Sequence, residues 1–231
     1  MSATSSSARI AIVTGGNSGI GQAIAENLAR DHHVYTLSRR AASESPFADH
    51  AAITPVSLDI RDHARVAAFI ASLPRIDVLI HSAAIAKRFS VADATPDDWQ
   101  QQFAINVFAP AELTRLALPK LRQQHGQVVF INSGSGTRPL PGHAVYSASK
   151  FALHALAEAL RNEERQHGVR VATVYPGPTA TPMNPLTPEE SEQDKSAPAS
   201  IASAARLIVD STPDSQVTEL VVRPFNDPAA R

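Results

Sequence analysis

The sequence predicts an α/β protein with a Rossmann-type, doubly wound parallel sheet of about seven strands and helices on both faces. Short apolar runs alternate with longer segments of helical period, which is typical of βαβ units. Runs such as "IAIV" and "QVVFI" are apolar at every position, as expected for strands in a sheet that is covered on both faces. A glycine-rich stretch, "VTGGNSGIG", joins the first apolar run to the first helical segment.

The alternation assigns the strands and helices in chain order. A helix over "GIGQAIAENLARD" places Ile20, Ile24 and Leu28 on one face. The segment "RRAASESPFADHAA" is short, so we expect a turn there in place of a second long helix. Pro110 and Pro119 are candidate kinks or breaks in a helix that starts at a Thr95 cap. The predicted strands are 9–14, 33–38, 52–59, 77–83, 126–133, 169–176 and 217–224, and the other predicted helices are 62–73, 144–167 and 200–211.

The chain reads as one domain, 9–231, without a linker or a further internal repeat. We expect residues 1–8 to form a disordered tail, because a Ser/Thr run has little to bury. The segment 187–200, "TPEESEQDKSAPAS", is polar and lacks an apolar period. It is either plain disorder or a mobile loop near the substrate.

Composition excludes several classes of function. The 231 residues carry 21 basic and 22 acidic side chains, for a formal charge of −1, and form no basic stripe for nucleic acid or a membrane surface. No apolar run has membrane-spanning length. The absence of cysteine excludes disulfides and thiolate metal sites and fits a cytoplasmic protein. The nine histidines lack the HExxH spacing, so we predict no metal site.

The glycines of "VTGGNSGIG" suit the binding of a dinucleotide. Gly15 permits a tight turn after the strand, and Gly19 lets the backbone approach a pyrophosphate. Gly21 lets the helix pack closely on the sheet, while the start of the helix offers free N–H groups to an anion. The spacing is G-x3-G-x-G, which differs from G-x-G-x-x-G but has the same physical logic.

The end of the second strand, "TLSRR", bears on which dinucleotide binds. An NAD site usually has an acidic residue here that holds the ribose 2′-hydroxyl. Ser38 stands in that place, and Arg39 follows it. Because an arginine can pair with a 2′-phosphate, the sequence favours NADP(H) over NAD(H).

The stretch "HAVYSASK" places Tyr146 and Lys150 four residues apart in a predicted helix. Residues at this spacing share one face, so the phenol and the ammonium can meet. A free tyrosine has a pKa of about 10, and a nearby positive charge favours its phenolate. The pair is therefore a candidate acid/base group, although such pairs also occur as ordinary surface or packing residues.

With "TGGNSGIG", "YSASK" and the strand pattern together, residues 9 to about 224 resemble the short-chain dehydrogenase/reductase family. Its Thr-Gly-x3-Gly-x-Gly motif falls on 14–21, its acidic residue near adenine on Asp59, and its Pro-Gly turn on Pro176 and Gly177. The cofactor-binding residues that the sequence and this resemblance imply are Thr14, Gly15, Asn17, Ser18, Gly19, Ile20, Gly21, Ser38, Arg39, Asp59, Ile60, Ala83, Ala84, Tyr146, Lys150, Pro176, Gly177, Thr179 and Thr181.

The resemblance also implies a catalytic set. Tyr146 would exchange a proton with the substrate oxygen, and Lys150 would support the phenolate and hold the nicotinamide ribose. Ser133 would hydrogen-bond the substrate oxygen, and Asn106 would hold a water in a proton relay. Ser135 competes for the serine role; the thirteen-residue separation from Tyr146 favours Ser133.

One motif departs from the family. The family commonly reads Asn-Asn-Ala-Gly after the fourth strand, where this chain has "HSAA", residues 81–84. We expect His81 to be a buried, hydrogen-bonded structural residue. Ala84 fits beside a cofactor if its φ is negative.

The leading hypothesis is an NADP(H)-dependent carbonyl reductase or alcohol dehydrogenase that acts on a small molecule. The alternatives are a dinucleotide-binding sensor without turnover and a dehydratase or epimerase on the same fold. Lys87, Arg88, Arg138 and His143 lie near the expected substrate loops and would favour an anionic substrate, unless they are simply solvated. By the resemblance, the helices with Asn106 and Tyr146 form a subunit interface in a homodimer or homotetramer.

Overall fold

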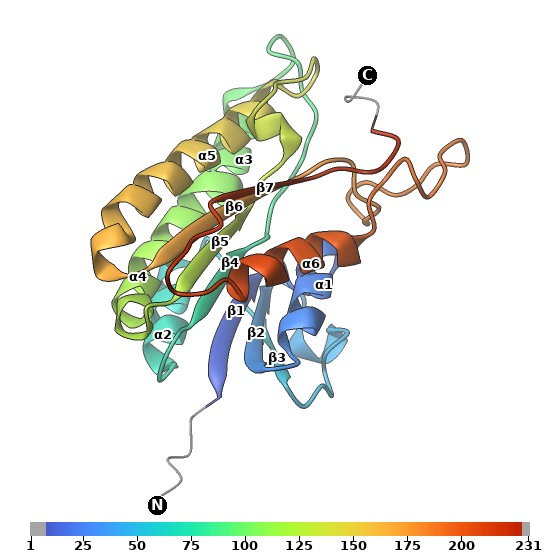
Figure 1. The fold of residues 1–231 in the computed structure, drawn as a ribbon. Helices are drawn as coiled ribbons and strands as arrows, with labels where there is room; N and C mark the ends of the chain where they lie inside the picture. Colours follow the sequence, from blue (N-terminus) through green and yellow to red (C-terminus); the bar gives the residue numbers. More distant parts are fainter. Residues whose placement is uncertain (1–7, 228–231) are drawn as a thin grey trace, which may run out of the picture.

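A computed structural model describes residues 8–227, so the greater part of the predicted N-terminal tail lies outside the described residues. One seven-stranded parallel sheet, in the order β3-β2-β1-β4-β5-β6-β7, forms the centre (Figure 1). The strand order reverses between β1 and β4, and in such sheets ligands bind at the carboxyl ends beside that point. The strands are β1 Arg9–Thr14, β2 His32–Ser38, β3 Ile53–Ser57, β4 Val78–His81, β5 Gln127–Ile131, β6 Arg170–Pro176 and β7 Glu219–Val222.

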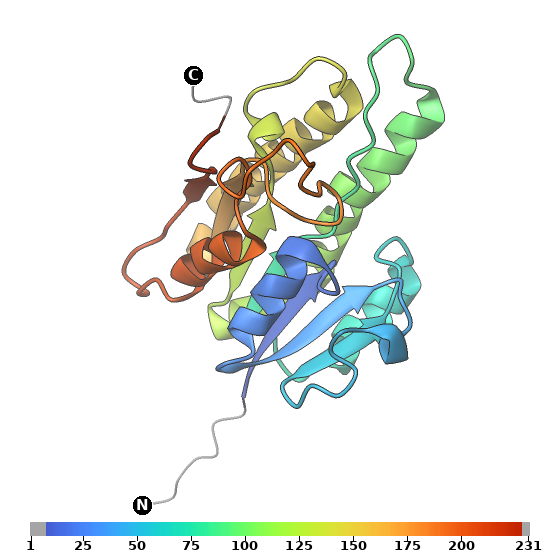
Figure 2. The ribbon, with the colours of Figure 1, turned by 90° about the vertical axis from the view of Figure 1, so that its right-hand side faces the viewer.

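Helices cover both faces of the sheet, as predicted (Figures 1 and 2). One face carries α1 and α6, whose Leu28 and Ile201 are buried in one apolar cluster. The other face carries α2, α4 and α5, whose Leu113 and Leu153 are buried in a second cluster. The helices are α1 Gly19–Leu28, α2 His63–Ser72, α3 Pro96–Phe103, α4 Ala109–Gln124, α5 Ala144–Glu164 and α6 Pro198–Val209.

Several predicted strands are too long at their carboxyl ends. β3 ends at Ser57 and β4 at His81, and β5 ends at Ile131. Beyond these points the chain leaves the ladder and forms the loops above the sheet edge. β7 also begins later than the predicted residue 217. The predicted turn after β2 is confirmed, because only a single turn of 3₁₀ helix, η1 (Ala42–Glu44), forms there.

The predicted helix from Thr95 consists of three consecutive parts. A capping box of Thr95 and Asp98 starts α3, then a π-helical turn, η2 (Ala104–Phe108), leads into α4. Neither proline breaks the segment: Pro110 lies in the first turn of α4, where its missing N–H is tolerated, and Pro119 lies inside the helix. The π turn was not predicted, and it falls on Asn106.

The segment 187–200 is turn-rich, and its last three residues begin α6, which starts two residues before the predicted helix. Pro198 stands in the first turn of this helix, where its fixed φ is favourable. Lys195 is buried and donates from Nζ to the carbonyl of Pro185 at 2.5 Å, and its Nζ lies 2.6 Å from a carboxylate oxygen of Glu190. The mobility of this segment stays a prediction.

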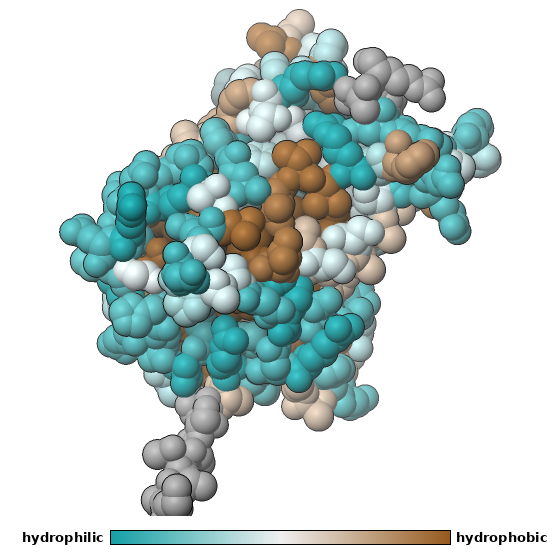
Figure 3. Space-filling model, in the orientation of Figure 1, coloured by the Kyte–Doolittle hydropathy of each residue, from teal (hydrophilic) through white to brown (hydrophobic). Residues whose placement is uncertain are grey.

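The surface is mostly hydrophilic, with an apolar area on the face that carries β7 and α6 (Figure 3). Leu207 of α6 and Val221 of β7 are both exposed. No helix among residues 8–227 is long and apolar enough to cross a membrane.

Candidate active site

A cleft of about 440 Å³ opens beside the carboxyl ends of β1, β2 and β4. It lies at the reversal of strand order, where parallel sheets bind ligands. Of the predicted cofactor-binding residues, those lining it are Gly15, Asn17, Ser18, Gly19, Ile20, Gly21, Ser38, Arg39, Asp59, Ile60, Ala83, Ala84, Tyr146, Lys150 and Thr181. Thr14, Pro176, Gly177 and Thr179 lie outside its lining.

The glycine-rich turn is shaped by three close approaches. Gly15 has a φ of 66°, and a β-carbon there would lie 2.9 Å from Cα of Ala83. Gly19 has a φ of 55° at the start of α1. A β-carbon on Gly21 would lie 2.4 Å from the carbonyl oxygen of Gly15, so only glycine fits there. The turn therefore exposes the free N–H groups of α1 to the cleft, as a phosphate site requires.

Hydrogen bonds fix the polar side chains beside the glycine-rich turn. Asn17 is buried; its Nδ2 donates to Oγ of Ser38 at 2.8 Å and its Oδ1 accepts from Thr36 at 2.9 Å. Oγ1 of Thr14 accepts from the backbone N–H groups of Ser82 and Ala83, both at 3.1 Å. Thr14 thus joins the end of β1 to the loop after β4 without itself lining the cleft.

Asp59 is bound to an arginine that the sequence analysis did not single out. Arg61 contacts both carboxylate oxygens of Asp59, with the shortest distance at 2.6 Å. This guanidinium holds the pKa of Asp59 down at about 2. Arg39 and Arg40 also line the cleft. The end of the cleft by β2 and β3 therefore carries three arginines and one carboxylate that is already paired.

The departure at 81–84 is accommodated by the fold. His81 is buried; its Nε2 lies 2.8 Å from Oγ1 of Thr114, and its ring stacks on Phe130. His81 is therefore buried and in hydrogen-bond contact, as expected. Burial lowers its pKa to about 3, which keeps the ring neutral at neutral pH. Ala84 has no positive φ, and its methyl group is tolerated beside the cleft.

Tyr146 and Lys150 meet on one face of α5 at the inner end of the cleft. Nζ of Lys150 lies 5.8 Å from the centre of the Tyr146 ring and donates to the carbonyl of Ile131 at 3.1 Å. Burial lowers the pKa of Lys150 to about 8. Burial also raises the pKa of Tyr146, and a hydrogen bond with Ser133 offsets part of that rise.

Ser133 follows β5 and caps a turn of 3₁₀ helix, η3 (Gly134–Gly136), in which its Oγ accepts from the N–H of Ser135 at 3.1 Å. The structure brings Ser133, and not the buried Ser135, to Tyr146. Ser135 faces the protein interior as part of the same turn.

Asn106 is buried in the π turn. Its side chain donates to and accepts from the backbone of Ile85, both at 2.9 Å, and donates to Oγ of Ser149 at 3.0 Å. Asn106 therefore ties the loop after β4 to α5. Since Pro110 has no N–H, the ordinary helical bond to the Asn106 carbonyl cannot form.

The turn after β6 closes the other side of the cleft. The N–H of Gly177 donates to the carbonyl of Val222 at 2.7 Å, and Oγ1 of Thr179 donates to the Gly177 carbonyl at 3.0 Å. Thr181 reaches Gly19, where a β-carbon would lie 3.2 Å from its methyl group. Thr181 thus faces the glycine-rich turn, while Pro176, Gly177 and Thr179 support that position from behind.

Several cleft residues were not singled out from the sequence. Arg61 follows Asp59 by two residues, and this spacing at a strand end was the available signal. Gly16 does not line the cleft, but it packs on Thr36, where a β-carbon would lie 2.6 Å from the threonine methyl group. The further lining residues are Leu37, Arg40, Leu58, Ser82, Ile85, Ile105, Ile131, Asn132, Pro182 and Met183.

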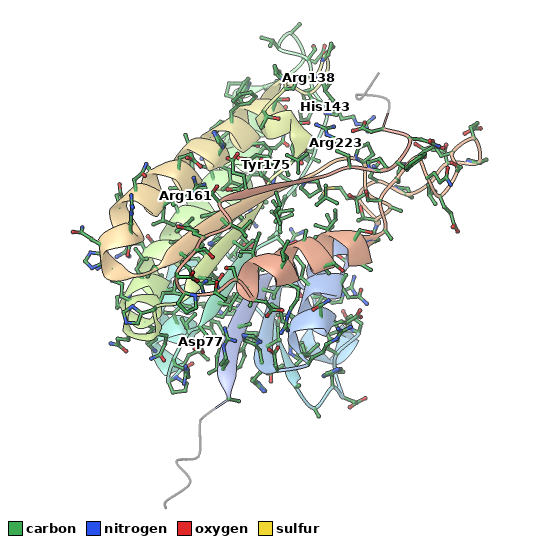
Figure 4. All side chains as sticks on the ribbon, viewed as in Figure 1. Asp77, Arg138, His143, Arg161, Tyr175 and Arg223 are labelled. Atoms are coloured by element: carbon green, nitrogen blue, oxygen red, sulfur yellow. The ribbon has the colours of Figure 1, made fainter. Side chains whose placement is uncertain are left out.

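A cluster of metal-ligating types lies away from the cleft. His154, Glu158 and Glu219 have ligand atoms within 4.8 Å of one another. Tyr175 donates to Glu219 at 2.9 Å and lies 2.5 Å from Nδ1 of His154, while Arg161 pairs with Glu158 (Figure 4). Each of the three side chains is thus already in contact with Tyr175 or Arg161, and we assign no metal to the cluster.

Comparison with known proteins agrees with this geometry. The short chain dehydrogenase family model matches residues 9–192. An uncharacterized oxidoreductase of Staphylococcus epidermidis is 29% identical over 94% of this chain and 97% of its own length. A short-chain dehydrogenase structure from Streptomyces avermitilis is 31% identical, with a TM-score of 0.83 over 94% of this chain and 88% of that one. A metagenomic short-chain oxidoreductase in complex with NADP is 28% identical, with a TM-score of 0.79 over 94% and 97%.

The fold and the family match define an oxidoreductase with a Rossmann-type sheet. The chain belongs to the short-chain dehydrogenase/reductase family.

Proposed function

We propose that the protein is an NADP(H)-dependent oxidoreductase that interconverts a carbonyl and a secondary alcohol on a small molecule. The observation that carries the proposal is the Tyr146–Lys150 pair. Its ammonium is buried and lies 5.8 Å from the phenol ring, at the inner end of a cleft that begins at the glycine-rich turn.

Tyr146 is the proposed general acid and base. Because burial raises its pKa, the phenol is neutral at neutral pH, which is the form that can donate a proton to a carbonyl oxygen. In the reverse direction Tyr146 takes the hydroxyl proton, and the nearby charge of Lys150 stabilises the phenolate that results. Lys150 is mostly protonated at pH 7, since its pKa of about 8 lies above that value.

Ser133 and Asn106 are proposed supporting groups. Ser133 lies beside Tyr146, so its hydroxyl can donate to the same substrate oxygen and stabilise the charge that develops there. The Asn106 side chain is fully engaged with Ile85 and Ser149. Its main-chain carbonyl, without the ordinary helical donor, is then the group that holds a relay water between Lys150 and solvent.

The residues of the cleft fit a dinucleotide, which would supply or accept the hydride when bound. Gly15, Gly19 and Gly21 leave room where β-carbons would collide, and α1 begins there. Arg39 forms no ion pair within residues 8–227 and follows Ser38 at the position suited to a 2′-phosphate. The carboxylate of Asp59 beside the adenine position is paired with Arg61, so it repels a phosphate less.

The family resemblance supports a homodimer or homotetramer. The exposed Phe108 and Phe151, on η2 and α5, are apolar groups that such an interface would cover. A cytoplasmic location stays a prediction from composition.

The test is NADPH and NADH oxidation by the purified protein against a panel of ketones, aldehydes and oxo acids, with Tyr146→Phe beside it. We expect turnover with NADPH that falls by more than about 1000-fold in the variant, since general acid catalysis and proton positioning are both lost. NADPH binding by the variant, followed by nicotinamide fluorescence, is the control for folding.

Other results would contradict the proposal. Turnover that survives in Tyr146→Phe would exclude the acid/base role. NADPH binding without turnover of any compound would favour a sensor, and loss of substrate without net NADPH consumption would favour a dehydratase or epimerase.

A further inference from the structure

Arg223 stands at the end of the sheet where the active site lies. It directly follows β7, whose Val222 is paired in register with Pro176 of β6. The N–H of Gly177 donates to the carbonyl of Val222 at 2.7 Å, so the two chains leave the sheet side by side. Carboxyl ends of parallel strands are where such folds bind ligands. The proposed function assigned no role to Arg223.

The Arg223 side chain reaches across two glycines toward the catalytic serine. A β-carbon on Gly177 would lie 3.4 Å from Cα and from Cγ of Arg223. A β-carbon on Gly134 would lie 3.4 Å from Nη2 of the same arginine. Gly134 is the residue after Ser133. The guanidinium therefore lies over the backbone of Gly134, next to Ser133, where the glycine has no side chain to cover the backbone.

One edge of this guanidinium is fixed and the other is free. Nη1 donates to Oδ2 of Asp227 at 2.5 Å, and the Asp227 side chain is only 2% exposed. Nη2 donates to no group within residues 8–227, and 36% of the Arg223 side chain is exposed. The N–H of Asn226 also donates to the carbonyl of Gln193 at 3.0 Å, which anchors this segment. A guanidinium held in this way is preorganised to bind an anion with its second edge.

Other basic side chains lie at the same end of the molecule as Arg223 (Figure 4). Arg138, in the loop before α5, is exposed and has no ion pair among the described residues. Burial lowers the pKa of His143, and the nearby charge of Arg88 adds to this shift. The His143 ring lies 6.4 Å from the Tyr146 ring. Figure 4 shows Arg138, His143 and Arg223 at the same end of the molecule. By contrast Lys87, also predicted near this site, is hydrogen-bonded to Gln101 at 3.1 Å.

We propose that Arg223 determines substrate specificity by binding an anionic group, a carboxylate or a phosphate, that the substrate carries near its reacting carbonyl. This inference rests on the proposed function and narrows its substrate class. Ser133 holds the carbonyl oxygen, and Nη2 of Arg223, over the next residue, holds the anion. Asp227 positions the guanidinium without closing its free edge.

Matched pairs of compounds test this proposal. The pairs are acetoacetate and methyl acetoacetate, levulinate and methyl levulinate, and dihydroxyacetone phosphate and dihydroxyacetone. Initial rates are measured at saturating NADPH for the wild type, Arg223→Gln and Arg223→Lys. Arg165→Gln, which removes an exposed positive charge at the far end of α5, is the matched control. The first two pairs report on a carboxylate and the third on a phosphate.

The wild type is expected to prefer the anionic member of at least one pair. Arg223→Gln should raise the KM for that anion by about 10- to 100-fold and bring the preference close to 1, since a charge-assisted contact is lost. The KM of Arg223→Lys for that anion should lie between those of the wild type and Arg223→Gln, because lysine keeps the charge but lacks the paired N–H donors of a guanidinium. Arg165→Gln should keep the wild-type preference. A wild type that prefers the neutral member of every pair overturns the proposal, as does an equal loss for both members in Arg223→Gln.

A binding measurement separates this proposal from the proposed function. Acetoacetate, levulinate and dihydroxyacetone phosphate are titrated by calorimetry into Tyr146→Phe saturated with NADPH. If an anion binds to Tyr146→Phe and not to the double variant Tyr146→Phe/Arg223→Gln, the anion site is supported. If the anion site is supported and no compound is turned over, only the proposed function fails. Turnover of neutral carbonyls together with no anion binding leaves the proposed function intact and overturns the role of Arg223.

Discussion

The two sides of the cleft hold their polar groups differently. On the side of the glycine-rich turn, where we propose that the cofactor binds (the cofactor side), Asn17 and Thr14 are buried and hydrogen-bonded to neighbouring strand ends. On the opposite side, where we propose that the substrate binds (the substrate side), Arg138 and Arg223 are exposed, and Arg223 makes one hydrogen bond within residues 8–227. We propose that the fixed contacts serve the cofactor and that the exposed charges select the substrate. Changes on the first side should therefore alter binding of the cofactor, and changes on the second should alter the choice of substrate.

The largest effect is expected at Gly21, on the cofactor side. Gly21→Ala would bring a β-carbon within 2.4 Å of the Gly15 carbonyl oxygen, so the glycine-rich turn must shift. We expect the free energy of unfolding to fall by about 1–3 kcal/mol, measured by urea titration, as for other overpacked sites. The affinity for NADPH should also fall, measured by fluorescence titration.

Gly142→Ala is the matched variant on the substrate side. Gly142 has a φ of 73°, but no atom of residues 8–227 lies within 4 Å of the β-carbon that an alanine would add. The strain of a positive φ should cost about 1–2 kcal/mol of stability. The affinity of Gly142→Ala for NADPH should stay at the wild-type value. If Gly21→Ala also keeps the wild-type affinity for NADPH, the expected difference between the two sides is wrong.

A pH-dependent effect is expected at His81, beneath the cofactor side. Burial lowers its pKa from 6.5 to about 3. Between these values the unfolded chain binds a proton that the folded chain does not, so the free energy of unfolding falls as the pH drops through this window. His81→Asn removes the titrating group, and its stability should depend less on pH between 6.5 and about 3.

Urea titrations at several pH values measure this dependence. His167→Asn, at an exposed position in the 3₁₀ turn η4 (Arg165–His167), should keep the wild-type slope. A slope in His81→Asn that equals that of the wild type would exclude His81 as the source.

The narrowest effect is expected at Arg39, because it concerns the affinity for one cofactor and not the stability of the fold. Arg39→Gln should weaken NADPH binding by about 10- to 100-fold, the range for a lost hydrogen-bonded charge on a phosphate. NADH binding should change little, because NADH lacks the 2′-phosphate. Arg30→Gln, an exposed position after α1, controls for the loss of one positive charge. Equal weakening for both cofactors would assign the 2′-phosphate instead to another group of the cleft, such as Arg40.

The fold and the site differ in how far the sequence predicts them. The strands from "RIAIVT" to "VTELVVRP" were found in order, because a buried strand or an amphipathic helix leaves a local, periodic pattern. The carboxyl ends of β3, β4, β5 and β7 were predicted too late, because the residue pattern does not mark where the chain leaves the ladder. The Tyr146–Lys150 contact followed from helical spacing alone, and Ser133 came from the family resemblance.

Only the tertiary structure decided the contacts between distant segments. The hydrogen bonds of Asn106 to Ile85 and Ser149 and the reach of Arg223 over Gly134 each join segments that are far apart in the chain, so no local pattern encodes them. Arg223 and Gly134 are far apart in the sequence and meet because β7 and β5 end at the same edge of the sheet. The sequence by itself thus determined the sheet, the glycine-rich turn and the meeting of Tyr146 and Lys150 on one helix face. The substrate side depends on how the last strand and the loop after β5 come together in space.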